Sequence, residues 1–270
     1  MLNKRPLCRG VWLVLALLIA GGMAGALHAR ADRSRDDTRR RIRVPILMYH
    51  YVSTPPPDAD QYRLDLSVTP AQFAEHLHWL RESGFTSISL DDLYAALTQG
   101  QPLPPQPVVL TFDDGYADAF THAFPLLQAF GLTGTFFVVT EWLDNGQTGY
   151  LTWHQAREMA AAGMSIQSHT RSHPDLTDAC DHDCLVYQIL GSLQTIEAEI
   201  GVRPRFLCYP GGRYDQTTLA VLEQVGIEAA VTTQAGTLQV SDRLLELPRA
   251  RIRGTTQIAD LAWMMNAWRE

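Results

Sequence analysis

Basic residues and cysteines are scarce in this chain, and each scarcity argues against a class of function. Lys and Arg number 22 against 29 Asp and Glu, so the formal net charge of the 270 residues is −7. This balance disfavours nucleic acid as a partner, because a phosphate backbone is bound by clustered Lys and Arg. The chain has only four cysteines. A structural zinc site normally needs four good ligands, and no second Cys or His pair lies near Cys180 and Cys184 to complete one.

Internal repeats are also absent, and nothing in the sequence marks a second domain. Hydrophobic residues make up 46% of the chain, enough to bury one sizeable core. We therefore expect one folded domain at residues 44–270, preceded by a signal segment at residues 1–31 and a charged linker at residues 32–43. The sole basic cluster lies in or beside this linker. We interpret it as solvated, with contact to anionic lipid as the alternative; it comprises Arg30, Arg33, Arg35, Arg39, Arg40, Arg41 and Arg43.

One apolar run long enough to direct export lies at the N-terminus. Lys4, Arg5 and Arg9 precede the apolar residues 11–27, and Ala29-Arg30-Ala31 offers an Ala-x-Ala cleavage site. The pattern predicts an exported protein in the periplasm or cell envelope. Two fates of the segment stay open, removal or retention as an inner-membrane anchor. About seventeen apolar residues are at the lower limit of a membrane span, and the arginines that follow resist translocation.

Three cysteines follow the export segment, which is an odd number. In an oxidising compartment Cys180 and Cys184 could close a small loop, although a pair four positions apart is geometrically demanding. Either could instead pair with Cys208. A zinc knot formed by the first two cysteines around His182 is a further alternative, which lacks a fourth ligand nearby.

Short apolar runs alternate with helical stretches beyond the linker, a pattern typical of a parallel α/β architecture. Two capping boxes, Thr69-Pro70-Ala71-Gln72 and Thr152-Trp153-His154-Gln155, mark helix starts. Polar groups cluster at the strand ends, which predicts a distorted (β/α) barrel of about seven parallel strands in a single catalytic domain, with its site on the C-terminal face. The expected strands are 42–49, 86–90, 108–112, 134–139, 164–168, 206–209, 228–232 and 246–252. The expected helices are 70–83, 90–98, 117–129, 153–162, 185–200 and 216–225.

Two short polar segments carry the chemistry. Asp113 and Asp114 end the buried strand 108–112, and His169 and His173 follow the strand 164–168. Two imidazoles and one carboxylate can hold a divalent metal and leave positions open for water and a carbonyl oxygen, and such a metal makes hydroxide available near neutral pH. An Asp-Asp-Gly surface turn or a lone histidine pair would each be a common structural feature. Together the two segments predict metal-assisted hydrolysis, with one carboxylate to spare.

Three motifs follow one another in the order seen in NodB-type polysaccharide deacetylases (carbohydrate esterase family 4), which this chain resembles. They are the aspartate pair, the segment His169-Thr170-Arg171-Ser172-His173, and the segment Tyr209-Pro210-Gly211-Gly212. Two further segments, Pro45-Ile46-Leu47-Met48-Tyr49-His50 and Leu247-Pro248-Arg249, are more similar to the PgaB/IcaB-like subgroup of poly-N-acetylglucosamine deacetylases. The resemblance covers roughly residues 44–260.

The resemblance implies roles for individual residues. Asp113 would act as the general base, and Asp114 would ligate the metal with His169 and His173. Zn²⁺ is the first choice, and Co²⁺, Ni²⁺ or Fe²⁺ stay open because this ligand set does not discriminate sharply. The backbone N–H of Tyr209 would help to hold the developing oxyanion, with Pro210 and Gly211 forming the turn that the sugar approaches.

The chain departs from the commonest family pattern at the arginine that positions the catalytic base. In the family this arginine stands about where Cys208 is, so we expect Arg249 or Arg251 to replace it. Trp153, at a capping box, is expected to pack in the core, with sugar stacking as the alternative.

A second departure concerns the general acid. The usual late Leu-x-His is absent, and no histidine follows His182. Protonation of the leaving amine is therefore open among His50, a water on the metal, and Asp113 after it has accepted a proton. His50 ends the first expected strand, where it would line the site or be a satisfied core histidine.

These observations predict a metal-dependent hydrolase that removes acetyl groups from the amides of an N-acetylhexosamine polymer and releases acetate. Poly-β-1,6-N-acetylglucosamine is favoured through the subgroup resemblance, with peptidoglycan and chitin-like oligomers open. The expected partners are the N-acetylated polysaccharide and an exopolysaccharide synthesis and export machinery. A deacetylase or amidase of small molecules or O-acetyl esters is one alternative, and an inactive carbohydrate-binding protein is another.

Overall fold

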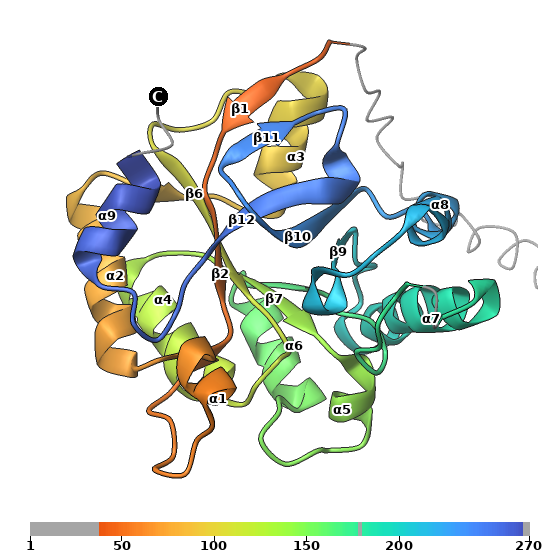
Figure 1. The fold of residues 1–270 in the computed structure, drawn as a ribbon, viewed down its shortest axis with the longest axis horizontal. Coiled ribbons are helices and arrows are strands. Elements are labelled where there is room, and N and C mark those ends of the chain that lie inside the picture. The colour runs from red at the N-terminus through yellow and green to blue at the C-terminus, as the bar shows by residue number, and fades with distance from the viewer. Residues whose placement is uncertain (1–37, 178–179, 267–270) are drawn as a thin grey trace, which may run out of the picture. The chain divides into compact units, whose positions relative to one another are not determined.

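Seven parallel strands close into a barrel in the computed structural model, which describes residues 38–177 and 180–266 (Figure 1). Their order is β2-β12-β10-β9-β8-β7-β6, and pairing of β2 with β6 closes the ring. This arrangement confirms the predicted barrel. The strands are β2 (Ile46–Tyr49), β6 (Pro107–Phe112), β7 (Thr135–Val138), β8 (Ser165–Ser168), β9 (Phe206–Cys208), β10 (Ala229–Ala235) and β12 (Leu247–Arg251).

The predicted first strand, 42–49, is divided in the structure. Its start forms β1 (Arg41–Arg43), which pairs antiparallel with β11 (Leu238–Val240) outside the barrel. The break falls at Pro45, which has no N–H to donate to a strand ladder. The end of the expected linker is thus part of the fold. Two short pairings complete the strands, β5 (Thr86–Ser87) beside β6 and β3 (Tyr51–Val52) beside β4 (Ser67–Val68).

Four helices begin where the sequence predicts, whereas the helix expected at 185–200 begins three residues earlier, at His182. Three capping boxes, opened by Thr69, Ser89 and Thr152, satisfy the first free backbone N–H groups of their helices. Asp215 does the same for a fourth helix with Thr218 as its partner. The helices are α2 (Pro70–Glu82), α3 (Leu90–Gln99), α6 (Trp153–Ala161) and α8 (Gln216–Val225), with the longer α7 (His182–Ile200) capped by Asp181.

The predicted helix 117–129 is wrong as a single element. The chain forms a π-helical turn at Ala119–Ala123 and then α4 (Phe124–Phe130), because Pro125 cannot continue the hydrogen-bond ladder of a preceding turn but fits the first turn of a new helix. Three helices were not predicted: α1 (Gln61–Leu66), α5 (Thr140–Asp144) and α9 (Ile258–Asn266). The first two are shorter than two turns, too short for an apolar period to show.

An aromatic cluster supports the end of the barrel where β2 and β6 finish. The ring of Phe112 stacks on those of Tyr49 and Phe136, with centroids 5.4 and 4.6 Å apart, and Phe73 of α2 meets Tyr49 edge-on. All four side chains are fully buried. The residues that follow Tyr49 and Phe112 therefore start from a rigid base.

The described residues all belong to one compact unit, Arg35–Glu270. Within residues 38–177 and 180–266, no helix is long and apolar enough to span a bilayer. The predicted export segment, 1–31, and the linker up to residue 37 lie outside the described residues.

Candidate active site

The end of β6 supplies both carboxylates of the site. The N–H of Asp113 still donates to the carbonyl of Tyr49, at 3.0 Å, so this residue continues the sheet. Asp114 and Gly115 then take left-handed backbone conformations, with φ of 72° and 71°. Because side chains alternate along a regular strand, this turn is what brings two consecutive carboxylates into one site.

Asp114, His169 and His173 come together at the C-terminal end of the barrel. Oδ1 of Asp114 lies 3.1 Å from Nε2 of His169 and 3.5 Å from Nε2 of His173. Asp114 and His169 are buried, whereas about a third of the His173 side chain is exposed. One ligand atom from each residue lies within 4.8 Å of the others.

This triad fits a divalent metal. Two ligands about 2.1 Å from a common ion at a tetrahedral angle lie about 3.4 Å apart, close to the separations seen here. Nδ1 of His169 lies 2.7 Å from the carbonyl of Cys208, which can only accept a hydrogen bond, so Nδ1 carries the proton and Nε2 faces Asp114. A backbone partner of this kind orients a ligating imidazole.

The charges of the triad also suit a cation. Burial acts to raise the pKa of Asp114, but the hydrogen bond and charge of His169 outweigh it and the pKa is lowered. Burial and the nearby His169 lower the pKa of His173 to about 4. Near neutral pH, Asp114 is therefore a carboxylate and His173 a neutral imidazole, the forms that bind metal. Burial acts to lower the pKa of His169, but Cys208 and Asp114 outweigh it and the pKa is raised, so metal binding would displace a proton from this ring.

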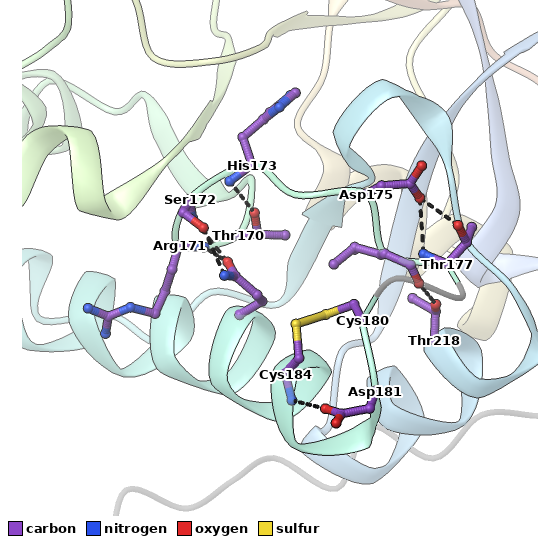
Figure 2. The surroundings of a disulfide bond; sticks show 12 residues. Thr170, Arg171, Ser172, His173, Asp175, Thr177, Cys180, Asp181, Cys184 and Thr218 are labelled. Carbon is purple, nitrogen blue, oxygen red and sulfur yellow. Dashed lines mark hydrogen bonds between the residues drawn. A yellow bond between two sulfur atoms is a disulfide. The ribbon is translucent and has the colours of Figure 1, made fainter.

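The loop after β8 presents His173 through hydrogen bonds to α7 (Figure 2). Oε1 of Gln188 accepts from the N–H groups of Arg171 and Ser172, at 3.2 and 3.0 Å, and its Nε2 donates to the hydroxyl of Ser172. The N–H of His173 donates to Oγ1 of Thr170. Both of these last residues have positive φ, 60° and 69°, a conformation that costs free energy in residues other than glycine.

A disulfide joins Cys180 to Cys184 at the start of α7 (Figure 2). This is one of the pairings that the sequence left open, and Cys208 is a buried free thiol. The alternative zinc knot around His182 is wrong, because both neighbouring sulfurs are in the disulfide. Among the residues that the structure describes, the groups able to hold a metal do not include His182.

Arg249 holds Asp113 from β12, which is separated from β6 by the single strand β2. Its Nη1 and Nη2 donate to the two carboxylate oxygens at 2.8 and 2.7 Å, while Nε donates to the carbonyl of Thr232 and Nη1 also to the hydroxyl of Thr111. Burial acts to raise the pKa of Asp113, but the charge and hydrogen bonds of Arg249 outweigh it and the pKa is lowered. Asp113 is thus a carboxylate fixed in orientation.

Of the two arginines expected near Asp113, the structure places only Arg249 there. Arg251, two residues along β12, instead donates to Asp65. Cys208 lies between the partners, with Sγ 3.4 Å from Oδ2 of Asp113 and 3.2 Å from Nη2 of Arg249. The short cysteine leaves room for a guanidinium that comes from another strand.

His50 lies at the edge of the same carboxylate. Its Nε2 is 3.9 Å from Oδ2 of Asp113, and its Nδ1 is buried without a hydrogen-bond partner. Burial lowers the pKa of His50 despite the nearby aspartates. His50 is therefore a neutral, site-lining residue rather than a satisfied core histidine.

The Tyr209-Pro210-Gly211 segment leaves β9 in a tight turn. The N–H of Tyr209 donates to the carbonyl of Val231 over a long 3.3 Å, so an oxyanion would have to compete for it. The Tyr209 hydroxyl donates to Leu245, away from the triad. At Gly212, a Cβ would collide with the side chain of Thr233, so this turn requires glycine.

The structure confirms the expectation for Trp153. This residue donates from Nε1 to Asp144 and packs on the hydrophobic core. In contrast, four aromatic residues that the sequence analysis did not single out stand beside the triad. They are Tyr51, Tyr116, Trp142 and Tyr150. The first two follow strand-end motifs directly, which is the one sequence signal that could have identified them.

Comparisons with known proteins identify the family of this chain. Residues 100–230 match the family model described as polysaccharide deacetylase. YxkH of Bacillus subtilis (strain 168), whose name assigns it to the polysaccharide deacetylases, is 30% identical over 215 residues, which are 80% of this chain and 73% of that protein. The chain belongs to the polysaccharide deacetylase family. This confirms the resemblance that the motifs indicated.

The chain is also similar to a second curated protein and to a solved structure. A poly-β-1,6-N-acetyl-D-glucosamine N-deacetylase of Escherichia coli K12 is 25% identical over 237 residues, and the match covers 73% of this chain but only 35% of the E. coli protein. Among solved structures, Streptococcus pyogenes deacetylase PplD in complex with acetate has a TM-score of 0.77 at 29% identity. That match covers 84% of this chain and 100% of PplD.

Proposed function

We propose that this deacetylase hydrolyses the acetamide groups of an N-acetylhexosamine polymer and uses a divalent metal, Zn²⁺ in the first instance. The observation that carries the proposal is the pair of environments at the end of β6. Asp113 is an oriented carboxylate with a lowered pKa, and its neighbour Asp114 joins two imidazoles in a ligand set. A base beside a metal triad is the arrangement that amide hydrolysis by water needs.

The chain's own residues account for the proton movements. Asp113 accepts a proton from the attacking water as the new C–O bond forms at the acetyl carbonyl. It then delivers that proton to the amine nitrogen as the C–N bond breaks, so acetate and a free amine leave. When bound, the metal would polarise the acetyl carbonyl and stabilise the developing negative charge. The N–H of Tyr209 supports the same charge if it exchanges its long bond to Val231.

The resting state of His50 favours Asp113 as the proton donor. An imidazole acts as a proton donor in its charged form, which becomes a neutral ring when the proton leaves. A buried imidazole with a lowered pKa is already neutral near pH 7 and cannot donate in this way. Its position 3.9 Å from Asp113 suits a different task, to line the side of the carboxylate and restrict how water approaches.

Poly-β-1,6-N-acetylglucosamine is the polymer that we propose first. The support is the name of the E. coli relative together with the similarity of the opening and late motifs to that subgroup. The predicted export segment supports action in the periplasm or cell envelope, beside an exopolysaccharide synthesis and export machinery.

The test is acetate release by the purified full-length protein from N-acetylglucosamine oligomers of several linkages. Metal-stripped protein and the Asp113→Asn variant are measured in parallel. Release that needs both metal and Asp113, and that is fastest on β-1,6-linked oligomers, supports the proposal. Release from acetylated small molecules or O-acetyl esters alone contradicts the polymer assignment. Metal binding without turnover on any acetylated sugar contradicts catalysis and favours a binding protein.

A further inference from the structure

A continuous row of aromatic rings lies along the C-terminal rim of the barrel. The ring of Tyr51 stacks on Tyr116 and that of Tyr116 on Tyr150. Tyr150 meets Trp142 at an interplanar angle of 45°, and Trp142 stacks on the imidazole of His173. The centroid separations are 3.5, 5.3, 4.3 and 5.8 Å in that order. At the far end the guanidinium of Arg63 covers the outer face of Tyr51. We call these four aromatic residues the ring row.

The ring row follows the order of the strands. Tyr51 comes after β2, Tyr116 after β6, Trp142 and Tyr150 after β7, and His173 after β8, and these four strands are consecutive neighbours in the barrel. Each ring therefore joins its own βα loop to the next. The row thereby links four loops that are distant in sequence, and one of its ends is a proposed metal ligand.

Backbone hydrogen bonds fix the loops that carry the rings. The N–H of Ala117 donates to Gly149 and that of Leu151 to Gly115, both at 2.9 Å, on either side of the Tyr116 and Tyr150 pair. At the first turn of α5, the N–H of Glu141 donates to the carbonyl of Arg171 at 2.8 Å. The helix that bears Trp142 is thus bonded to the loop that bears His173.

The stacking leaves the row poorly suited to binding a sugar by itself. An aromatic ring binds a sugar through a free face, and the inner rings Tyr116 and Tyr150 have a ring neighbour on each side. All four side chains are half-buried. The ring faces in the row are thus occupied by contacts with one another, and the last ring, Trp142, contacts the proposed ligand His173. This arrangement suits a role in holding that ligand in place.

His173 needs such support more than its partners do. It is the most exposed of the three proposed ligands, and it lies on a loop rather than at a strand end. His169 is held by the Cys208 carbonyl, whereas the hydrogen bonds described around His173 reach only its backbone N–H. Within the triad the ring of His173 meets His169 edge-on, with centroids 4.8 Å apart, and its Nε2 faces Asp114. The stacked face of Trp142 is the ring contact that comes from outside the triad.

We propose that Trp142, backed by Tyr150, is a positioning residue that holds the His173 imidazole at the metal site. This inference rests on the metal site of the proposed function. Loss of an outer partner that hydrogen-bonds a metal ligand typically costs about 10- to 100-fold in metal affinity, and we take this range as the expected effect of the ring partner.

The test compares two tryptophans in the full-length protein. Trp142→Leu removes the ring that faces His173. Trp142→Phe keeps a ring there. Trp153→Leu is the matched control, because this tryptophan packs on the core from α6 and donates only to Asp144. Zn²⁺ affinity is measured by competition with a chromophoric chelator, and the visible absorption spectrum of the Co²⁺-loaded protein reports the ligand geometry.

The expected result is a loss of Zn²⁺ affinity of about 10- to 100-fold for Trp142→Leu, with a changed Co²⁺ spectrum. Trp142→Phe should stay within about threefold of wild type and restore the spectrum, and Trp153→Leu should lower stability without changing either. Tyr150→Leu, which keeps Trp142 but removes the ring behind it, should give a smaller loss and decides the question if Trp142→Leu does not fold.

Wild-type affinity and an unchanged Co²⁺ spectrum in both Trp142→Leu and Tyr150→Leu overturn the inference and leave the proposed function intact. An equal loss of affinity in Trp153→Leu also overturns it, because the effect would then be general destabilisation. Failure of the wild-type protein to bind Zn²⁺ or Co²⁺ overturns the metal site itself and the inference with it.

Discussion

The two halves of the site are held by opposite means. Asp113 sits at a strand end inside the barrel, where every polar atom of its partner Arg249 is bonded to β6, β9 or β10. His173 sits on a loop outside the sheet, with positive φ and partial exposure, and depends on a glutamine and a row of rings. The barrel fixes the base, whereas neighbouring loops fix the ligand. A defect in one half should therefore leave a different signature from a defect in the other.

The largest effect should come from Asp113→Asn. The amide keeps the shape of the side chain but cannot take a proton from water, and general bases contribute about 10²- to 10⁴-fold. We expect kcat/KM for acetate release to fall by about a thousandfold while Zn²⁺ affinity stays within a few-fold of wild type. A loss of metal affinity as large as the loss of rate would show that the two halves are not separate.

Arg249→Met should affect stability and the pH profile together. Removal of one partner of a buried ion pair costs about 3–5 kcal/mol, because the other charge is left uncompensated. Without the arginine, burial raises the pKa of Asp113, so the acid limb of the kcat/KM profile should move to higher pH. Urea unfolding and a pH series measure the two effects.

Arg251→Met is the matched control for this change, since Arg251 lies on the same strand but pairs with Asp65. It should leave the pH profile where it is. An unmoved acid limb in Arg249→Met would mean that the guanidinium does not set the state of the base.

Gln188→Leu should weaken the loop half of the site. This side chain bonds the N–H groups of Arg171 and Ser172 and the hydroxyl of Ser172. Its loss leaves only the bond from the N–H of Arg171 to the backbone carbonyl of residue 188 between this part of the loop and α7, which loosens the loop that carries His173. We expect about tenfold weaker Zn²⁺ binding with little change in the state of Asp113. The exposed Gln194 on the same helix provides the control substitution, Gln194→Leu.

The disulfide should matter less to the metal than Gln188 does. Cys180 and Cys184 close a loop of four residue steps, for which loss of the cross-link costs at most about 2 kcal/mol of unfolding free energy. Cys184→Ser should therefore lower stability modestly and keep most of the metal affinity. Equal losses of Zn²⁺ affinity in Cys184→Ser and Gln188→Leu would move the support of His173 from the glutamine to the disulfide.

The sequence was most informative about the half of the site that the barrel fixes. Strand ends are marked by buried apolar runs, and capping boxes fix where helices begin, so the barrel and the location of Asp113 and Asp114 followed from local patterns. Arg249 was one of two alternatives, because Arg251, two residues further along β12, carries the same charge and lies on the same face of the strand. Only the positions of Thr111, Thr232 and Asp65 distinguish them.

The loop half of the site was harder to predict from the sequence. The sequence indicated the histidines through their spacing, but the stacking of Trp142 on His173 joins loops after β7 and β8, and no local pattern encodes such a contact. For the same reason α1 and α5 were missed. Short helices in βα loops are stabilised by what they pack against, and a six- or five-residue segment carries too little periodicity to predict them.

The smallest expected effect concerns His76, which lies beneath the barrel half of the site. Its Nε2 lies 3.2 Å from the carbonyl of Thr256, which can only accept, so Nδ1 of the neutral ring accepts from the hydroxyl of Tyr49. Burial lowers the pKa of His76. The unfolded chain therefore binds this proton more readily than the folded one, and the contribution of His76 to stability is lost as the pH falls below about 6.5.

Urea unfolding at pH 7.5 and 5.5 tests this contribution with two variants of α2. His76→Gln removes the buried titrating group, whereas His78→Gln changes an exposed histidine on the same helix. The drop in unfolding free energy between the two pH values should be smaller in His76→Gln than in wild type by up to about 1 kcal/mol, and unchanged in His78→Gln. An equal drop in all three proteins would show that the acid sensitivity arises elsewhere.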